Sequence, residues 1–366
     1  MRIGLDWRPT FEGRGGIPVY VRGLVAGLAS RFPDDRLLLY GHQVRGRFGP
    51  RRRTTAPPPP RASLRAAPIP SRAADALGRL GIGADVLVGG CDVFHATDYA
   101  WLAPSRAAFV ATIHDVLFEE LPRCFTPGMR TGLRRITRRL VRRTTRLLVP
   151  SVRTKAGLVE RFGADPARVD VVPLAPRAFP VVEPARFDRP TLLAVGTLEP
   201  RKNLRRVIEA FGLLRARGVD ADLVVVGARG WLDDAILAAA AATSGVRVEG
   251  AVDDARLSAL YGGATALVYP SLGEGFGLPV VEAMAASLPV VTSAATTCAD
   301  VAGPASLLVD PYDVESIADA LTRVVTDEAL RADLAVRGRA EAARYSWDAT
   351  AEGTRACYER AIRGRA

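Results

Sequence analysis

The chain has 366 residues, of which 48% are hydrophobic and 24% charged, a composition typical of a soluble globular protein with two or three domains. It contains no uncharged apolar run of about eighteen residues, which argues against a membrane-spanning helix. The net charge of +11 is uneven, because residues 1–189 hold 32 Lys and Arg against 16 Asp and Glu, whereas the remainder holds 18 against 23. We expect the two halves to meet different partners.

The N-terminus and the cysteines indicate a cytoplasmic protein. "MRIGLDWRPT" lacks the apolar core of a signal peptide and is interpreted as the first strand of a fold. The cysteines lie far apart without metal-ligand spacing, at Cys91, Cys124, Cys298 and Cys357. This spacing favours a reducing compartment and argues against a disulfide framework or a zinc site.

Residues 1–180 alternate short apolar runs with helical segments. "RIGLD" precedes a glycine-bearing loop and then "IPVYVRGLVAGLASRF", where Val21, Leu24, Val25 and Leu28 have helical spacing. The later apolar runs are "RLLLYG", "VFHAT", "AFVATIHD", "RLLVPS" and "VDVVPL". Such alternation predicts a parallel sheet covered by helices on both faces.

Residues 45–72 interrupt this alternation with four consecutive prolines and many arginines. These residues exclude a helix or a central strand, and they predict a mobile surface loop.

Residues 173–190 contain five prolines and are predicted to link two domains. After them the alternation restarts with "TLLAVG", "NLRRVIEAFGLLRARG" and "ADLVVVG", and it continues to about residue 345. The sequence therefore predicts an α/β protein with two doubly wound domains facing across a cleft, at 1–180 and 190–345. In open sheets of this kind, ligands bind outside the carboxyl ends of the strands.

Two cations follow the first strand of the second domain. In "TLLAVGTLEPRKNLRRVIEAF", Arg201 and Lys202 lie in the loop after the strand, and Asn203 is placed to cap the next helix. A guanidinium fork and an ammonium beside a helix N-terminus suit a diphosphate, although an isolated surface Arg-Lys pair is usually only solvated.

Two carboxylates flank a glycine-rich turn in "SLGEGFGLPVVEAM". Gly275 and Gly277 allow backbone N–H groups to approach an anion at the helix start. Glu274 precedes this turn and Glu282 lies one turn into the helix, so the pair can reach hydroxyls on both sides of a bound diphosphate. A nucleotide sugar has this layout, although two glutamates eight residues apart are usually structural.

These segments resemble the retaining glycosyltransferases of family 4, which have the GT-B fold and an E-x7-E motif. "EGFGLPVVEAM", "GTLEPRKN", "GGIPVYVRGL", "TIHDV" and "VPSVRTKAGLVERFG" occur in the order that is usual in this family. The resemblance covers nearly the whole chain, and "ATIHDVLFEELP" is similar to mannosyltransferase-like members. It implies that the last helix, 346–366, packs back toward the N-terminal domain.

The resemblance also implies roles for individual residues. Glu282 would bind the donor ribose and Glu274 the hydroxyls of the transferred sugar, while Arg201 and Lys202 would neutralise the departing diphosphate. The remaining donor contacts would come from the backbone of Gly16, Gly275, Phe276, Gly277 and Leu278, and, around the base, from Arg229, Val252 and Leu257.

The histidines and two aspartates also allow structural interpretations. The resemblance places His114 near the transferred sugar as a catalytic residue, and His95 is a second candidate on the acceptor side. A lone histidine at a strand end is more often a hydrogen-bonded structural residue. Asp253 and Asp254 are interpreted as helix-capping residues.

No Asp-x-Asp lies at a strand end in the first half, where a metal-dependent transferase needs one. We therefore expect no metal and no cofactor, with arginine and lysine stabilising the leaving group in the place of a cation. The family implies retention of configuration, for which a front-face displacement is the usual mechanism.

"MRTGLRRITRRLVRRTTR" predicts an amphipathic helix with an arginine-rich side. Arg134, Arg135, Arg138 and Arg142 are candidates for contact with an anionic acceptor or the inner face of a membrane, and a solvated helix face is the alternative. Nucleic acid is disfavoured because no aromatic platform accompanies the arginines.

Three functions remain open at this point. The first is hexose transfer from a nucleotide-diphosphate sugar, with GDP-mannose as the expected donor and UDP- and TDP-sugars as alternatives. The acceptor would be a saccharide, a lipid-linked glycan or a natural product. The second is a nucleotide-sugar epimerase or a dehydrogenase, although "FEGRGGIPVY" lacks the G-x-G-x-x-G pattern of a dehydrogenase. The third is a catalytically silent nucleotide-sugar or glycan-binding protein.

Overall fold

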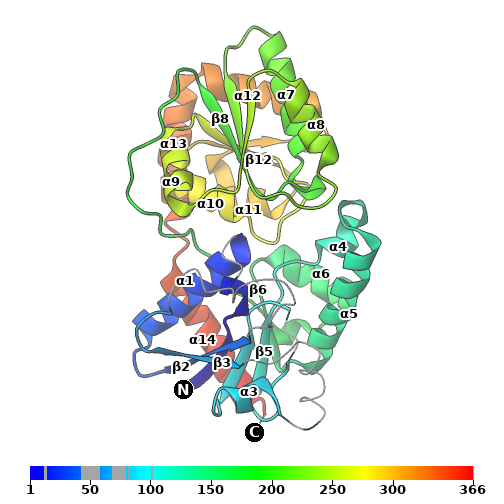
Figure 1. Ribbon diagram of the computed structural model, residues 1–366, viewed down its shortest axis with the longest axis vertical. Coiled ribbons are helices and arrows are strands. Elements are labelled where there is room, and N and C mark those ends of the chain that lie inside the picture. The colour runs from blue at the N-terminus through cyan, green and yellow to red at the C-terminus, as the bar shows by residue number, and fades with distance from the viewer. Residues whose placement is uncertain (12–14, 43–57, 68–79, 81, 100–101, 366) are drawn as a thin grey trace. The chain divides into compact units, whose positions relative to one another are not determined.

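The computed structural model describes residues 1–11, 15–42, 58–67, 80, 82–99 and 102–365, and the chain divides into two compact units (Figure 1). Unit 1 comprises Met1–Val116, Thr131–Ala175 and Ser346–Ala366, and unit 2 comprises Leu117–Arg130 and Pro176–Tyr345. Within the described residues, no helix is both long enough and apolar enough to cross a membrane.

Unit 1 is built on a seven-stranded parallel sheet with the order β3-β2-β1-β4-β5-β6-β7. Its strands are β1 (Arg2–Asp6), β2 (Arg36–His42), β3 (Ala62–Ala67), β4 (Val93–Ala96), β5 (Ala108–Thr112), β6 (Arg146–Val149) and β7 (Val169–Val171). The helices are α1 (Gly16–Arg31), α3 (Ala84–Leu87), α5 (Pro127–Arg143), α6 (Val152–Phe162) and α14 (Trp347–Arg363). The first residues of α5 belong to unit 2.

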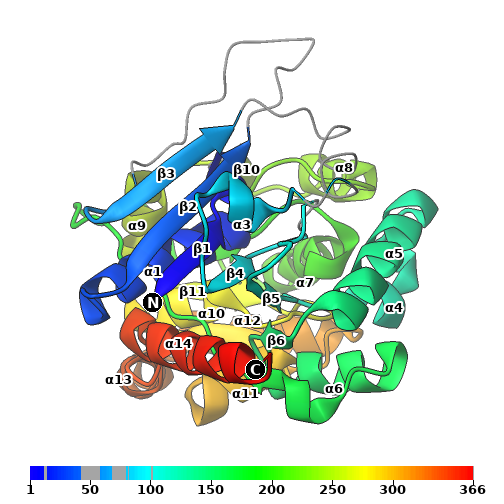
Figure 2. The same cartoon turned by 90° about the horizontal axis from the view of Figure 1, so that it is seen from below.

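Helix α14 belongs to unit 1, where it packs on α1 and on β4, β5 and β6 (Figure 2). The two helices approach closely because α1 has glycine at 23 and 27. A Cβ atom at Gly23 would lie 2.2 Å from the Trp347 ring, and one at Gly27 would lie 2.6 Å from the Trp347 carbonyl oxygen. On the same helix, the predicted apolar residues Val21, Leu24, Val25 and Leu28 are all buried.

The prediction of a loop at 45–72 is wrong for part of this segment. Residues 62–67 form β3, which pairs in parallel with β2 at the edge of the sheet. An edge strand tolerates exposed polar residues, because only one side of its backbone is paired, and Ser63 and Arg65 are exposed. Residues 45–57 and 68–72 lie outside the described residues.

Unit 2 is built on a six-stranded parallel sheet with the order β10-β9-β8-β11-β12-β13. Its strands are β8 (Thr191–Val195), β9 (Asp222–Val226), β10 (Val246–Gly250), β11 (Ala266–Tyr269), β12 (Val290–Ser293) and β13 (Leu307–Val309). The helices are α4 (Leu117–Glu120), α7 (Leu204–Ala216), α8 (Asp234–Ala242), α9 (Asp254–Gly263), α10 (Leu278–Ala285), α11 (Thr297–Ala302), α12 (Val314–Thr326) and α13 (Glu328–Ala342).

The main core of unit 2 lies between its sheet and the helices α7, α8 and α12 (Figure 1). Leu192 and Leu223 of the strands pack there with Phe211 of α7 and Leu321 of α12, all without exposure to solvent. Strands buried on both faces explain why the sequence has continuous apolar runs rather than alternating ones. The predicted alternation of strands and helices is confirmed in both units.

One segment of the first half belongs to unit 2, which differs from the expected boundary at residue 180. Leu117 and Leu121 lie so close to Gly273 that a Cβ atom there would approach each of them within 2.9 Å. The indole N–H of Trp231 donates to the Cys124 carbonyl at 2.6 Å. These contacts explain why 117–130 groups with residues far away in sequence.

Candidate active site

The strand order of unit 2 places its site at the centre of the sheet. The order reverses between β8 and β11, and open sheets bind ligands at the carboxyl ends of two such strands. Arg201 and Lys202 follow β8 and lie within the 3-10 turn Pro200–Lys202, while Glu274 follows β11. The fold therefore brings together two predicted motifs that are about seventy residues apart in the chain.

Arg201, Lys202 and Glu274 form a buried ion cluster. An Nη1 N–H of Arg201 lies 2.7 Å from Glu274 Oε2, and Lys202 Nζ donates to Glu274 Oε1 at 2.7 Å. The three side chains are between 8% and 13% exposed, so water screens these charges poorly. Burial alone raises the pKa of the Glu274 carboxyl, but the two cations outweigh it and lower that pKa to about 2. Glu274 is therefore a permanent anion at neutral pH.

Two further residues complete this cluster, and neither was predicted from the sequence. Glu199 Oε1 accepts from Arg201 at 2.6 Å, and burial raises the pKa of this carboxyl. The Tyr269 hydroxyl accepts from Lys202 at 2.6 Å and donates to Glu274 at 2.9 Å. Lys202 thus uses two of its three N–H donors, and within the described residues the third has no partner. Their positions in the sequence could have indicated both residues, because Tyr269 ends β11 and Glu199 immediately precedes the "PRK" turn.

The glycine-rich turn leads directly into α10. Gly277 precedes the helix with φ = 108°, a left-handed conformation that favours glycine, and a Cβ atom there would lie 2.9 Å from Cys298 Sγ. Phe276 is buried against Tyr345, with ring centroids 5.4 Å apart, and Leu278 begins the helix. Gly275 completes the turn that positions Glu274.

Glu282 lies inside α10 and is 1% exposed. Its Oε1 accepts from Arg177 Nε at 2.7 Å, and its Oε2 accepts from the Tyr261 hydroxyl at 3.2 Å. No spacing in the sequence singled out Arg177, which lies 105 positions earlier in the proline-rich segment.

The residues expected around the nucleotide base of the donor differ in exposure. Arg229 follows β9 and is 68% exposed, and it forms ion pairs with Asp233 at 2.8 Å and with Asp234 at 3.6 Å. Val252 precedes α9 and is half-buried, while Leu257 is a buried residue of that helix. Asp253 caps α9 as expected, because its side chain accepts from the Arg256 N–H.

Asn203 does not cap α7 as predicted. Its backbone is left-handed, with φ = 59°, which turns the side chain away from the N–H groups of the first turn. The amide instead donates to the carbonyls of Pro270 and Pro311, at 3.0 and 2.6 Å. It therefore fastens the "PRK" turn to the loops that follow β11 and β13.

Unit 1 contains Gly16 and His114. Gly16 is the exposed first residue of α1, so its backbone N–H lies at a helix N-terminus. His114 follows β5, and its Nε2 is 2.9 Å from the Thr97 carbonyl. Its ring packs edge-on against Tyr20 with the centroids 5.1 Å apart.

The structure does not support His95 as an acceptor-side residue. Its side chain has no exposure, and its two ring nitrogens lie 2.7 Å from the hydroxyls of Tyr358 and Thr112. Burial lowers the pKa of its imidazole to about 3, which keeps the ring neutral. His95 is therefore a structural residue of the core of unit 1.

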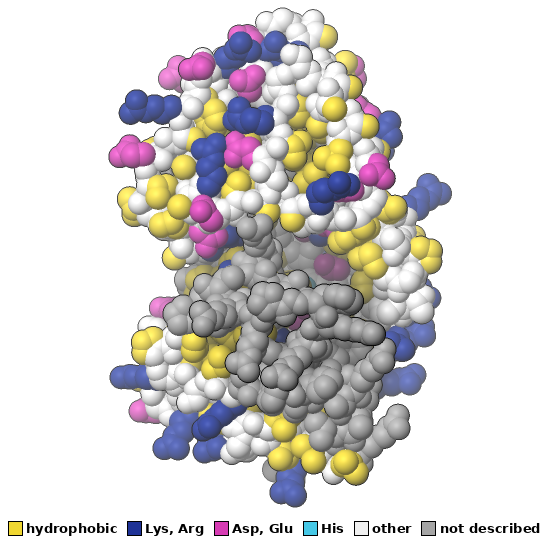
Figure 3. All heavy atoms as spheres, in the orientation of Figure 1, with side chains coloured by type: hydrophobic (Ala, Val, Ile, Leu, Met, Phe, Trp, Pro, Cys, Tyr) yellow, Lys and Arg dark blue, Asp and Glu magenta, His cyan; other side chains and the backbone are white. Residues whose placement is uncertain are grey.

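The predicted basic helix is present as α5, but Arg146 is not part of it. The helix ends at Arg143, and Arg146 begins β6, where it is paired with Asp170 at 2.7 Å. The helix buries Thr137, Leu140 and Val141. Two other apolar residues of the helix, Leu133 and Ile136, are half-buried. Its outer side forms a groove of about 470 Å³, lined by Thr131, Arg134, Arg135, Arg138, Arg139, Arg142 and Arg143. In the space-filling view, Lys and Arg side chains gather on the side of the molecule where Figure 1 draws α5 (Figure 3).

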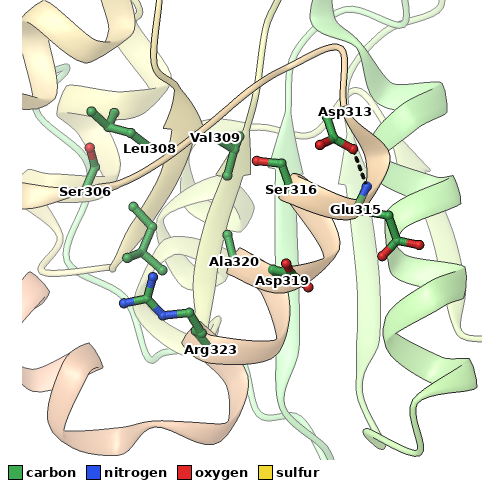
Figure 4. A pocket seen from close by; sticks show the side chains of 10 residues that line it. Ser306, Leu308, Val309, Asp313, Glu315, Ser316, Asp319, Ala320 and Arg323 are labelled. Carbon is green, nitrogen blue, oxygen red and sulfur yellow. Dashed lines mark hydrogen bonds between the residues drawn. The ribbon is translucent and has the colours of Figure 1, made fainter.

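A second groove, of about 560 Å³, lies between β13 and α12 (Figure 4). Two of its carboxylates are held by Arg217, which donates to Glu315 at 2.6 Å and to Asp319 at 2.8 Å. Asp313 caps α12 by accepting from the Glu315 N–H. None of the predicted site residues lines this groove, and its three acidic side chains already accept hydrogen bonds within unit 2.

The two halves of the chain match two described families. Residues 14–175 match Glycosyltransferase Family 4, and residues 178–341 match Glycosyl transferases group 1. The chain is 40% identical over 160 residues to O-antigen chain mannosyltransferase B of Escherichia coli, covering 43% of this chain and 42% of that protein. It is 30% identical over 243 residues to the MMP alpha-(1->4)-mannosyltransferase of Mycolicibacterium hassiacum, covering 63% and 58%. The chain thus spans about half the length of these curated relatives.

Solved structures show the same fold at low sequence identity. Sucrose-phosphate synthase of Thermosynechococcus elongatus superposes with a TM-score of 0.76 at 19% identity, covering 98% of both chains. HepE of Anabaena, in complex with UDP and glucose, has a TM-score of 0.71 at 16% identity, covering 97% of this chain and 98% of HepE. Together with the two family matches, this fold shows that the chain belongs to the family 4 glycosyltransferases of GT-B fold.

Proposed function

We propose that the protein is a retaining glycosyltransferase that moves mannose from GDP-mannose to a saccharide, a lipid-linked glycan or a natural-product acceptor. The observation that carries this proposal is the convergence of Arg201, Lys202 and Glu274 where the carboxyl ends of β8 and β11 meet. Glycosyl transfer from a nucleotide sugar leaves negative charge on a departing diphosphate. Cations already fixed in place stabilise such charge without reorganisation during the reaction.

Each residue of the site has a proposed part in this reaction. Arg201 and Lys202 bind the donor diphosphate, aided by backbone N–H groups at the start of α10. Glu274 accepts hydrogen bonds from hydroxyls of the transferred sugar, which suits an anion that cannot protonate near neutral pH. Glu282 accepts from the ribose hydroxyls. Gly16 and His114 act on the diphosphate and the transferred sugar from unit 1, and Arg229, Val252 and Leu257 lie around the base.

The choice of mannose follows the names of the relatives. Two of the relatives are named as mannosyltransferases, O-antigen chain mannosyltransferase B and the MMP alpha-(1->4)-mannosyltransferase. HepE was solved with UDP and glucose, so the nucleotide is the least constrained part of the proposal.

Transfer is proposed to need no metal ion and to retain configuration. Arg201 and Lys202 place fixed cationic groups at the proposed diphosphate site, where other transferases use a divalent ion. We propose a front-face displacement, in which the departing phosphate assists removal of the acceptor proton and Glu274 orients the sugar. Turnover is expected to be unchanged in a chelator, and the anomeric configuration of the product, read by NMR, is expected to match that of the donor.

A thermal-shift screen with GDP-, UDP-, TDP- and ADP-sugars tests the donor, because a ligand that binds the folded state raises the melting temperature. GDP-mannose is expected to give the largest rise, and incubation with acceptor is expected to give a mannosylated product. Release of an isomerised free nucleotide sugar would instead indicate an epimerase. Tight donor binding without any turnover, even with water, would indicate a silent binding protein.

The acceptor is proposed to reach the enzyme at an anionic membrane surface, on the cytoplasmic side, through α5. The helix has no acidic residue, and Arg135, Arg138, Arg142 and Arg143 are exposed without an ion pair to any described residue. Each basic side chain near an anionic bilayer contributes about 1 kcal/mol of binding.

Vesicle flotation tests this surface. Arg135→Gln, Arg138→Gln and Arg142→Gln together are expected to weaken binding to vesicles that contain anionic lipid on the order of 100-fold, since three basic side chains contribute about 3 kcal/mol. The charge-matched control replaces the ion-paired Arg205, Arg247 and Arg256 of unit 2 with Gln and is expected to bind like the native protein. Equal binding by the two triple variants would show that α5 is only a solvated face.

A further inference from the structure

Arg177 lies near the start of the second stretch of unit 2, Pro176–Tyr345. Its guanidinium contacts three groups. Nε donates to Glu282 Oε1 at 2.7 Å, and Nη1 donates to Asp254 Oδ1 at 2.6 Å. The guanidinium carbon lies 5.1 Å from the ring centre of Phe179. The side chain is 19% exposed, so this is a fixed part of the site rather than a mobile surface arginine.

These contacts close a ring of side chains around Glu282. The Tyr261 hydroxyl donates to the second carboxylate oxygen of Glu282, and the Phe179 ring packs edge-on against Tyr261 with the centroids 5.5 Å apart. Arg177 stacks on Phe179 and so completes the ring. Glu282 is therefore held from two sides by residues of α9 and of the segment after Pro176.

The segment that carries Arg177 is itself fastened to α9. The Ser258 hydroxyl donates to the Pro180 carbonyl at 2.9 Å, and the Ala185 N–H donates to the Ala259 carbonyl at 2.8 Å. Gly263 allows close approach, since a Cβ atom there would lie 2.0 Å from the Ala185 carbonyl oxygen. The position of Arg177 is thus set by the backbone as well as by its own side-chain contacts.

A ribose diol needs an acceptor with a particular charge and orientation. Its two hydroxyls donate best to an ionised carboxylate, which is acceptor-only, whereas a protonated carboxyl presents a competing O–H. Each carboxylate oxygen can accept two hydrogen bonds, and Arg177 and Tyr261 each use one on a different oxygen. Among the contacts of the described residues, these two leave one acceptor position on each oxygen for the diol.

We propose that Arg177 is a positioning residue for donor binding, which holds Glu282 ionised and oriented toward the ribose hydroxyls. This inference rests on the proposed function, because it assumes that Glu282 is the ribose ligand.

The charges around Glu282 agree with this role. Burial raises the pKa of the Glu282 carboxyl, and Arg177 is the largest opposing influence. Among the described residues, the other groups that influence the Glu282 pKa are Tyr261, whose hydroxyl donates to it, and Asp254, whose negative charge raises it. Removal of Arg177 would leave Asp254 unopposed, so Glu282 would take up a proton at a higher pH than in the native protein.

The test compares Arg177→Met, Arg177→Lys and the control Arg186→Met by calorimetric titration with GDP, 2′-deoxy-GDP and inorganic pyrophosphate. Arg186 lies nine residues later, is exposed, and has no side-chain partner among the described residues. Arg177→Met is expected to weaken GDP binding on the order of 10- to 100-fold, the range for losing a charge-assisted hydrogen bond. Pyrophosphate binding is expected to stay within about twofold, because it does not use the ribose site.

Three further results are expected if Arg177 acts through Glu282. The preference of the native protein for GDP over 2′-deoxy-GDP is expected to shrink in Arg177→Met. GDP affinity in this variant is expected to fall as the pH decreases from 8.5 to 6, more steeply than in the native protein. Arg177→Lys is expected to recover part of the affinity and to flatten the pH profile, which separates a charge effect from misfolding.

The outcomes distinguish this inference from the proposed function. If the native protein binds GDP and Arg177→Met binds it equally well or more tightly, with an unchanged pH profile, the inference is overturned while the proposed function stands. If the native protein binds neither GDP nor UDP, nor either nucleotide sugar, the proposed function itself fails.

Discussion

Replacing Lys202 with alanine is expected to reduce turnover far more than stability. Lys202 donates to Tyr269 and Glu274, so its loss removes one of two cations from the site. Glu274 retains Arg201 at 2.7 Å, and it is therefore not left as an unpaired buried charge. We expect the free energy of unfolding to fall by about 1–3 kcal/mol, less than the cost of breaking an isolated buried ion pair. Turnover is expected to fall on the order of 10²- to 10³-fold, or about 2.7–4 kcal/mol of transition-state stabilisation.

The assay is the steady-state release of nucleoside diphosphate from the donor sugar, together with thermal denaturation of each variant. The chain contains only two lysines, Lys155 and Lys202, which provides a matched control. Lys155 donates to the Val169 carbonyl in unit 1, and Lys155→Ala is expected to turn over like the native protein. Lys202→Arg is expected to fall between Lys202→Ala and the native enzyme, because a guanidinium keeps the charge but not the geometry of an ammonium. A Lys202→Ala variant that turned over within twofold of the native rate would refute the assignment of leaving-group stabilisation.

The remaining predictions concern the turn before α10 and the charge on Glu274. Gly277→Ala is expected to destabilise the fold by about 1–3 kcal/mol in thermal denaturation, because alanine disfavours φ = 108° and its Cβ would meet Cys298 Sγ. Gly212→Ala, on a helix with space for a methyl group, is expected to stabilise by about 0.5–1 kcal/mol; the opposite order of melting temperatures would contradict this account of the turn. The folded-state pKa of Glu274 is about 2, below the ordinary value of 4.5 for a glutamate side chain. It therefore contributes stability that is fully present above pH 4.5 and is lost as the pH falls toward 2, at most about 3 kcal/mol. Acid denaturation of Glu274→Gln should lack this component, and a native-like pH dependence in that variant would exclude Glu274 as its source.

The sequence was most informative where the local residue pattern determines the local structure, as in buried strands and glycine-rich turns. Continuous apolar runs predicted the buried parallel strands, because both faces of each sheet are covered. The glycines around Glu274 predicted a turn before a helix, and the structure adds that Gly277 in this turn is left-handed. The pairing of Arg201 and Lys202 with Glu274 follows from topology, since both segments end neighbouring central strands.

The errors arose where a partner distant in sequence decides the role of a residue. His114 follows an apolar strand, whereas His95 lies inside one and is enclosed by Tyr358, 263 positions away. Asn203 has a common capping residue type, but its left-handed backbone and the carbonyls of Pro270 and Pro311 give it another function. Composition was also misleading at β3, where an edge strand tolerates residues that a central strand excludes.

The central claim is that Lys202 lies at the donor diphosphate, and nitrogen-15 labelling of lysine alone tests it most directly. With two lysines in the chain, the NMR spectrum of the labelled protein should contain two lysine backbone amide signals, which Lys155→Ala assigns. Titration with GDP, and separately with UDP, is expected to shift the Lys202 signal and leave that of Lys155 in place. Saturating nucleotide that bound by calorimetry yet moved neither signal, or moved only that of Lys155, would contradict the account.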